Sequence, residues 1–217
     1  MLPLRIIRIS SLGQLEQLID LACQVWADDP LFACVVPGRH EHPEHFRQMW
    51  SMHLRKEYGN TGTVILAACK EEDGEIGDAM AFAIWRRHVL IRYRVAFDMF
   101  YTLTFRQTGG SVSISDATEV MTGLRNAGRL YPAERWRLCW LGVSPKCQRT
   151  GIGKRLVQWG LDRCDEERVP AVLEASEPGR GLYEKMGFRQ IGKSEFDKGR
   201  QIQPVMLREV QDAKKAV

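Results

Sequence analysis

Gln148-Arg149-Thr150-Gly151-Ile152-Gly153 is the stretch that decides the fold of this chain. The segment 138–143 before it is almost entirely apolar and predicts a buried strand. After it, small or apolar residues recur at the spacing of one helix face: Ile152, Leu156, Trp159/Gly160 and Cys164. A strand, two glycines and a helix start predict a phosphate cradle, because glycine permits a close backbone approach and the first helical N–H groups point at an anion.

Positive side chains gather beside this loop, at Lys146, Arg149, Lys154 and Arg155. The loop is not the one that binds nucleotide triphosphates, because the glycine spacing differs and no Lys-Ser/Thr follows. It is not the dinucleotide fingerprint either, since the third glycine is missing. The stretch therefore predicts a phosphate site of another kind.

The stretch resembles the Gln/Arg-x-x-Gly-x-Gly/Ala acyl-coenzyme A loop of the GNAT acetyltransferase superfamily. The resemblance continues with Val143-Ser144-Pro145, with the strand expected at 170–176, and with Gly181–Phe188, which is similar to that family's Leu-Tyr-x-x-x-Gly-Phe segment. It covers residues 134–192. It implies a mixed α/β fold, a central, mostly antiparallel sheet of about seven strands with helices on both faces. Residues 1–217 would form a single N-acetyltransferase domain with an acetyl-coenzyme A-binding core at 137–192.

Periodicity outside this stretch predicts the remaining elements. Ser11 with Gln14 forms a capping box for a first helix that should stop before Pro30. A second helix is expected at 43–58, and strands are expected at 4–9, 61–70, 78–89, 189–196 and 203–208.

The resemblance also implies a co-substrate, acetyl-coenzyme A, and no metal. In the family, the strands equivalent to 137–143 and 171–175 splay apart, and the pantetheine arm pairs with the first of them. The cofactor-binding residues that follow are Leu141, Gly142, Val143, Gln148, Arg149, Thr150, Gly151, Ile152, Gly153 and Lys154.

Tyr183 matches the family's tyrosine that stands near the cofactor sulfur and serves as general acid. The alternative is a core aromatic whose hydroxyl bonds to backbone, and the intact motif around Tyr183 favours the catalytic role. The base stays open. Glu174 is one candidate, although strand alternation could equally point it away from the gap. A base acting through waters, or an amine that needs none, are the others.

The acceptor side is expected to involve Asp28, Phe32 and Asp98. The first two lie in the connection that lines the acceptor pocket in the superfamily, and the charge of Asp28 or Asp98 would attract an ammonium group. Asp29 is instead predicted to cap a short helix that starts at Pro30.

The segment 91–135 exceeds the minimal family plan. It predicts a helix around 97–105 and another at 116–127, and it resembles the helical insertion of fungal members whose substrate is uncharacterised. Two interpretations stay open: a cover over the acceptor site, or a packing layer over one sheet edge.

Three histidines, His40, His42 and His45, cluster around Pro43 and raise the question of a metal site. No Cys or Asp stands at ligand spacing. We therefore predict an exposed helix start without metal.

The composition of the chain limits the class of protein to which it can belong. With 217 residues, 44% hydrophobic and 27% charged, the chain is typical of one globular domain. The net charge of +4 is scattered, which speaks against nucleic-acid binding. The N-terminus lacks the features of a signal peptide, and no run of 18 apolar residues occurs. Six cysteines without paired spacing predict a reducing, cytoplasmic setting.

The leading functional hypothesis is an acetyl-coenzyme A-dependent N-acetyltransferase that modifies a primary amine of a small molecule by direct attack in a ternary complex. The alternatives are a non-catalytic acyl-coenzyme A-binding protein and a protein lysine or N-terminal acetyltransferase. A monomer or homodimer without nucleic-acid or membrane partners is expected.

Overall fold

A computed structural model describes residues 4–72, 74–89 and 111–211. Seven strands form one sheet in the order β1-β2-β3-β4-β5-β7-β6, and every neighbouring pair is antiparallel except β4 with β5. The strands are β1 (Leu4–Arg8), β2 (Thr63–Glu72), β3 (Glu75–His88), β4 (Arg135–Val143), β5 (Ala171–Glu174), β6 (Arg189–Phe196) and β7 (Gln201–Arg208). The predicted mixed α/β fold with a seven-stranded, mostly antiparallel sheet is confirmed.

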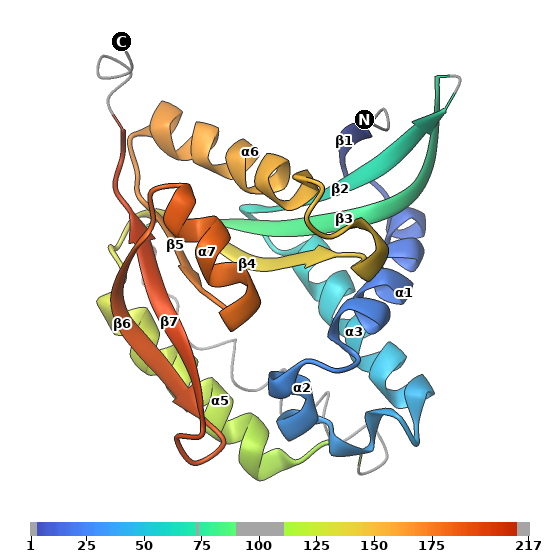
Figure 1. The fold of residues 1–217 in the computed structure, drawn as a ribbon, viewed down its shortest axis with the longest axis vertical. Helices are drawn as coiled ribbons and strands as arrows, with labels where there is room; N and C mark the ends of the chain where they lie inside the picture. The colour runs from blue at the N-terminus through green and yellow to red at the C-terminus, as the bar shows by residue number, and fades with distance from the viewer. Residues whose placement is uncertain (1–3, 73, 90–110, 212–217) are drawn as a thin grey trace.

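Helices cover both faces of this sheet, as the family resemblance implied (Figure 1). The described α-helices are α1 (Leu15–Trp26), α2 (Pro30–Val35), α3 (Pro43–Gly59), α5 (Ile114–Ala127), α6 (Ile152–Glu167) and α7 (Glu177–Lys185). Helices α1 and α3 lie on one face and α6 on the other (Figure 1). No helix in the described ranges is both long and apolar enough to cross a membrane.

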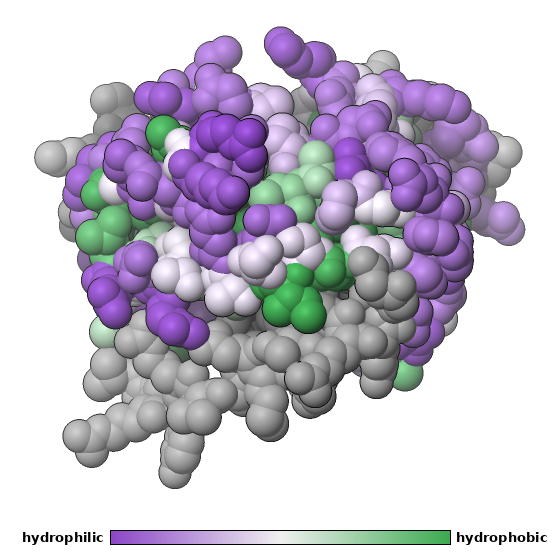
Figure 2. All heavy atoms as spheres, turned by 90° about the horizontal axis from the view of Figure 1, so that it is seen from below, coloured by the Kyte–Doolittle hydropathy of each residue, from purple (hydrophilic) through white to green (hydrophobic). Residues whose placement is uncertain are grey.

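At one end of the molecule, α2 packs against α5, and the backbone N–H of Ser113 donates to the carbonyl of Val35 at 2.9 Å. Figure 2 views the molecule from that end. Apolar side chains gather near the middle of the described surface, with hydrophilic ones around them (Figure 2).

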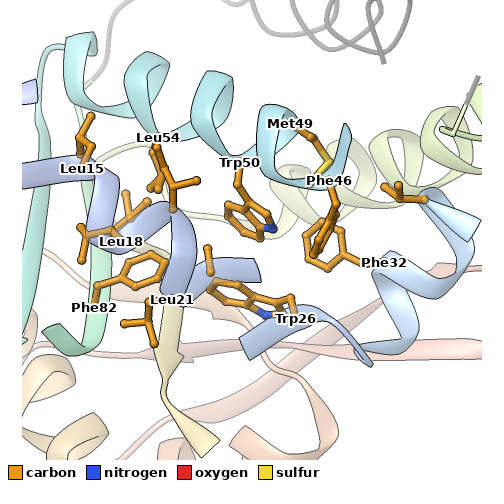
Figure 3. Close-up of a cluster of buried hydrophobic side chains, with 14 of the residues drawn as sticks. Leu15, Leu18, Leu21, Trp26, Phe32, Phe46, Met49, Trp50, Leu54 and Phe82 are labelled. Atoms are coloured by element: carbon orange, nitrogen blue, oxygen red, sulfur yellow. The ribbon is translucent and has the colours of Figure 1, made fainter. Parts of the chain in front are cut away.

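The central strands are buried on both faces, so their side chains divide between two cores. On β3, Phe82 and Ile84 join the cluster beneath α1 and α3, whereas Ala83 and Trp85 join the cluster beneath α6. Figure 3 shows the first cluster, in which the aromatic rings of α1, α2 and α3 lie side by side. Strand alternation thus builds two cores from one run of apolar residues.

The helix starts follow local sequence chemistry. The Gln14 side chain accepts from the backbone N–H groups of Ser10 at 2.8 Å and Ser11 at 3.2 Å, ahead of α1. Asp29 Oδ1 accepts from the N–H of Leu31 at 2.9 Å, and Pro30 is the first residue of α2. Both predicted caps are confirmed.

The sheet nearly divides between β4 and β5. These strands pair only at Trp136↔Ala171 and Arg137↔Val172, although β4 continues for six more residues. Cys139 is an extra residue in the ladder between β3 and β4, where Trp85 pairs with Leu138 and Ile84 with Trp140. Beyond Arg137 the two strands separate, as the resemblance implied (Figure 1).

Helix α6 approaches the sheet so closely that Gly160 has no room for a side chain. A Cβ atom there would stand 2.1 Å from Cε2 of Trp85, an indole that is 0% exposed and donates to the Leu156 carbonyl at 3.2 Å. We expect Gly160→Ala to lower the free energy of unfolding by about 3 kcal/mol, because Trp85 or the helix must shift.

Urea unfolding of wild type and variant would measure this loss. Gly181→Ala is the matched control, since a Cβ at this helical glycine meets nothing within 4 Å and should stabilise the protein by up to about 1 kcal/mol. Equal midpoints for the two variants would contradict the contact.

Candidate active site

The glycine loop folds as a phosphate cradle would. Gly151 precedes α6 with φ +87°, a conformation that favours glycine, and the first bond of the helix runs from Arg155 N–H to the Gly151 carbonyl at 3.2 Å. Thr150 Oγ1 donates to the Cys147 carbonyl at 2.6 Å and holds the turn. As at the start of any α-helix, the N–H groups of 152–154 have no carbonyl of their own helix to bond.

The predicted cofactor residues of β4 lie at the edge of the gap. Leu141, Gly142 and Val143 pair with β3 on one side, and the ladder with β5 has already ended at Arg137 on the other. The Gln148 side chain donates to the Val143 carbonyl at 3.4 Å and ties the loop to this strand end. The backbone edge that the resemblance assigned to the pantetheine arm therefore lies next to the loop assigned to the pyrophosphate.

Close packing against α1 also requires a residue without a side chain at position 142. A Cβ there would stand 3.0 Å from Trp26 Cη2 and 3.1 Å from Phe82 Cε1. The residue lets α1 approach the sheet, which its sequence context alone did not reveal.

Tyr183 extends from α7 into the wall of a cavity beside the gap. Its ring is buried, with its centroid 5.9 Å from that of Phe188, and burial raises the pKa of its hydroxyl. The phenol is therefore protonated at neutral pH and can donate a proton or a hydrogen bond. Whether it does so in a reaction stays a prediction.

Glu174 lies at the end of β5 and is held by an arginine on the facing strand. Arg137 Nη2 donates to both carboxylate oxygens at 2.9 Å, and Arg137 Nε donates to one of them at 3.2 Å. Both oxygens of this carboxylate are therefore occupied by the guanidinium. The assignment of Glu174 as the general base stays a prediction, and the ion pair joins the two strands where their ladder ends.

A second buried ion pair, Glu57 with Arg86, lies on the same side of the sheet. The Glu57 side chain is 2% exposed, and His53 Nε2 lies 3.9 Å from its other oxygen. These polar residues cannot be recognised from the sequence, because Glu57 and Arg86 are distant in the chain and each alone resembles a surface residue.

The two ion pairs line a cavity of about 180 Å³ between α1, α2, α3, α5 and the ends of the sheet strands. Phe32 and Asp29 are in its wall, whereas Asp28 is not. The Asp28 side chain is 91% exposed and lies 3.3 Å from Nε2 of His40. Asp98 is outside the described residues. Of the predicted acceptor residues, the structure therefore brings Phe32 to the cavity and leaves Asp28 on the surface.

Helix α5 confirms the second predicted helix of the segment 91–135; the one predicted at 97–105 lies outside the described residues. Val120, Met121 and Leu124 line the cavity. Gly123 packs on the edge strand β6, where a Cβ would stand 2.7 Å from the Glu195 carbonyl oxygen. The helix therefore covers a cavity and also packs over the sheet edge. Features of both interpretations, a cover and a packing layer, are thus present in one helix.

The predicted exposed helix start at Pro43 is confirmed, and Glu44 joins two of the histidines there. Glu44 supplies a carboxylate oxygen that lies 3.5 Å from His42 Nδ1 and 3.8 Å from His45 Nε2, and one donor atom from each residue lies within 4.8 Å of the others. Ser111 Oγ lies 2.7 Å from the other ring nitrogen of His45. These groups could hold a cation, although ion pairing accounts equally well for their arrangement.

Burial gives His53 a measurable signature. Burial is the main cause that lowers its pKa to about 4, the charges of Arg86 and Lys56 lower it further, and Glu57 opposes them. The unfolded chain, with a histidine pKa of about 6.5, binds a proton that the folded protein does not. Stability is therefore fully present above pH 6.5 and falls as the pH drops towards 4, by about 3 kcal/mol for this residue.

Denaturant unfolding of wild type and His53→Gln between pH 4 and 7 would test this dependence. The comparison isolates His53 from His88, whose pKa is also lowered by burial and neighbouring arginines. Parallel pH profiles of the two proteins would contradict a neutral buried His53.

Comparison with known proteins agrees with this geometry. Residues 118–208 match the family model described as an acetyltransferase (GNAT) domain. A probable acyltransferase SID5 from Ajellomyces capsulatus is 37% identical over 46 residues, which are 21% of this chain and 34% of the relative. The match thus spans about a third of that relative's length.

Solved structures share the fold over nearly the whole chain. A protein from Corynebacterium glutamicum described as histone acetyltransferase HPA2 and related acetyltransferase aligns with a TM-score of 0.69, 18% identity and 99% of both chains. Arylalkylamine N-acetyltransferase 2 from Aedes aegypti gives 0.63, 13% identity and coverage of 96% and 99%. PaiA N-acetyltransferase from Thermoplasma acidophilum, in complex with coenzyme A, gives 0.53, 15% and coverage of 95% and 99%. The domain match over residues 118–208, the curated relative and the shared fold are all similarities to GNAT acetyltransferases.

Proposed function

We propose that the protein is an acetyl-coenzyme A-dependent N-acetyltransferase that modifies a primary amine of a small molecule by direct attack in a ternary complex. One observation carries the proposal: the gap between β4 and β5 has the glycine loop on one side and the cavity with Tyr183 on the other. A cofactor in the gap and an acceptor in the cavity would meet at Tyr183.

The residues of the gap fit such a co-substrate. A Cβ at Gly151 would meet nothing within 4 Å, so the loop leaves open space beside its backbone. The N–H groups of 152–154 would hold the pyrophosphate, assisted by Lys154 and Arg149. The free edge of β4 at 141–143 would pair with the pantetheine arm in the manner of an added strand. When bound, acetyl-coenzyme A supplies the acetyl group.

The transfer needs a polarised carbonyl, a neutral amine and a proton for the leaving thiolate. A backbone N–H of Leu141 or Val143 would polarise the thioester carbonyl, and Tyr183 would give its proton to the departing sulfur. Glu174 positions Arg137 across the strands. The acceptor would attack as the neutral amine, after its ammonium has released a proton to solvent. The attacking nitrogen then carries one proton too many, and its release to solvent would balance the proton that solvent returns to Tyr183.

The size of the cavity favours a small acceptor over a protein. Helices α2 and α5 bound it, and about 180 Å³ is far less than a peptide segment needs. The alternatives, an acetyltransferase for protein lysines or N-termini and a non-catalytic acyl-coenzyme A-binding protein, have no such observation in their favour.

A turnover screen tests the proposal. The protein is incubated with acetyl-coenzyme A and a panel of primary amines, aminoglycosides and histone-type peptides, and the release of free thiol is followed. We expect turnover with a primary amine and none without acceptor. Binding of acetyl-coenzyme A without turnover across the panel would favour the binding protein instead.

A further inference from the structure

We propose that the acceptor is a lipophilic monoamine, with one amino group on a short arm attached to an aromatic or bulky apolar group, and that polyamines and amino sugars are excluded. This inference rests on the proposed function, since it names the substrate class of the same site. Three properties of the cavity carry it: its walls, its charge balance and its size.

One wall of the cavity is aromatic. Trp140 of β4 is partly accessible and makes an edge contact with Trp26 at 5.3 Å between centroids. Phe32 stacks on Trp140 at 5.9 Å, and Trp50 stacks on Trp26 at 4.6 Å (Figure 3 shows all of these except Trp140). Such a wall attracts a flat apolar group by area and by ring-to-ring contact.

A second part of the cavity lining is apolar but mostly aliphatic. Val120, Met121 and Leu124 extend from α5, and Phe196 of β6 lies beside them. Methionine adapts to the shape of a bound group, because its side chain is flexible and polarizable. An apolar group that contacts both sets of side chains would lose part of its contact with water.

The carboxylates of the cavity are mostly occupied. Glu57 is paired with Arg86, and Glu174 with Arg137, so these four side chains contribute no net charge. Asp29 is the remaining acidic residue among the described residues of the lining. Asp29 could therefore balance the charge of one ammonium group that enters the cavity. A second ammonium group would be buried without a counter-charge, at a large cost in binding free energy.

The size fits a single ring with a short arm. The cavity measures about 180 Å³, and an apolar cavity of about 150 Å³ is known to accommodate benzene. Amino sugars of several rings exceed this space, and their hydroxyl groups would lack partners along both walls.

Two probe amines of similar arm length separate the classes. Thiol release from acetyl-coenzyme A is measured with 2-phenylethylamine and with 1,4-diaminobutane. We expect kcat/KM to favour 2-phenylethylamine on the order of 10²-fold, because the second ammonium of the diamine has no partner. Equal rates, or a preference for the diamine, would overturn the inference.

A pair of neighbouring variants tests the charge argument. Met121→Glu places a carboxylate in the cavity wall, and Thr122→Glu places the same charge on the exposed side of α5. Met121→Glu should lower kcat/KM for 2-phenylethylamine about 10-fold and raise it for 1,4-diaminobutane. Thr122→Glu should leave both values unchanged. An identical effect of the two variants would contradict the assigned wall.

Binding measurements without the cofactor separate the two proposals. Quenching of tryptophan fluorescence reports the amines directly, since Trp140 lines the cavity. If 2-phenylethylamine binds in preference to the diamine but no amine is turned over, the inference stands and the proposed function fails. If the diamine is turned over in preference, the function stands and the inference fails. If 2-phenylethylamine neither binds nor reacts, the inference fails.

Discussion

Replacing Tyr183 with phenylalanine should lower kcat by about 10²-fold or more and leave the affinity for acetyl-coenzyme A nearly unchanged. The substitution deletes a hydroxyl that has its proton at neutral pH because burial raises its pKa. The ring that packs against Phe188 and lines the cavity remains. The loss therefore concerns the transition state, where the leaving thiolate needs a proton, and spares the ground state.

Steady-state kinetics with a reactive amine and calorimetric titration with coenzyme A would separate these effects. Tyr58→Phe is the matched control, because the Tyr58 hydroxyl donates to the Ser10 carbonyl at 2.7 Å and Tyr58 does not line the cavity. An unchanged kcat in the Tyr183 variant would refute the role of general acid and leave the fold and the cofactor loop unaffected.

Gly151→Val should reduce coenzyme A affinity by at least about 10²-fold. Gly151 has φ +87°, where a β-branched residue is strained by some 1–3 kcal/mol. Relief of that strain would turn the N–H groups of 152–154 away from the phosphate position and place a side chain in the open space beside the loop.

A control must separate the effect of backbone strain from the loss of coenzyme A contacts. Gly74, in the turn between β2 and β3, has φ +82°, and a Cβ there also meets nothing within 4 Å. Gly74→Val is therefore strained to a similar degree but distant from the loop. Calorimetric titration of both variants with coenzyme A should show weakened binding for Gly151→Val alone. Wild-type affinity in Gly151→Val would show that the loop is not part of the cofactor site.

The sequence predicted the structure best where the cause is local. The Gly151 turn, the start of α6 at Ile152 and the Asp29 cap of α2 each depend on a few adjacent residues. Their chemistry is complete within one short segment, so position along the chain was sufficient to place them.

Prediction failed where the cause is a partner elsewhere in the chain. Arg137 meets Glu174 because β4 and β5 are neighbours, and Gly160 meets Trp85 because α6 covers β3. Neither contact leaves a local pattern. The sequence also could not show that Asp29 lines the cavity while Asp28 is exposed, since two adjacent carboxylates differ only in which way the chain turns them.

Because the contact between β4 and β5 is short, the two halves of the sheet should differ in how readily they open. Two ladder positions and the pair of Arg137 with Glu174 join a half-sheet of β1 to β4 to a half-sheet of β5 to β7. Both half-sheets also contribute to the core beneath α6, so we expect their amide hydrogens to exchange with different but coupled protection. A molecule that bonds along the free edge of β4 would join the two half-sheets. A saturating concentration of such a ligand should therefore slow amide exchange in β5 and β7 as well as in β4.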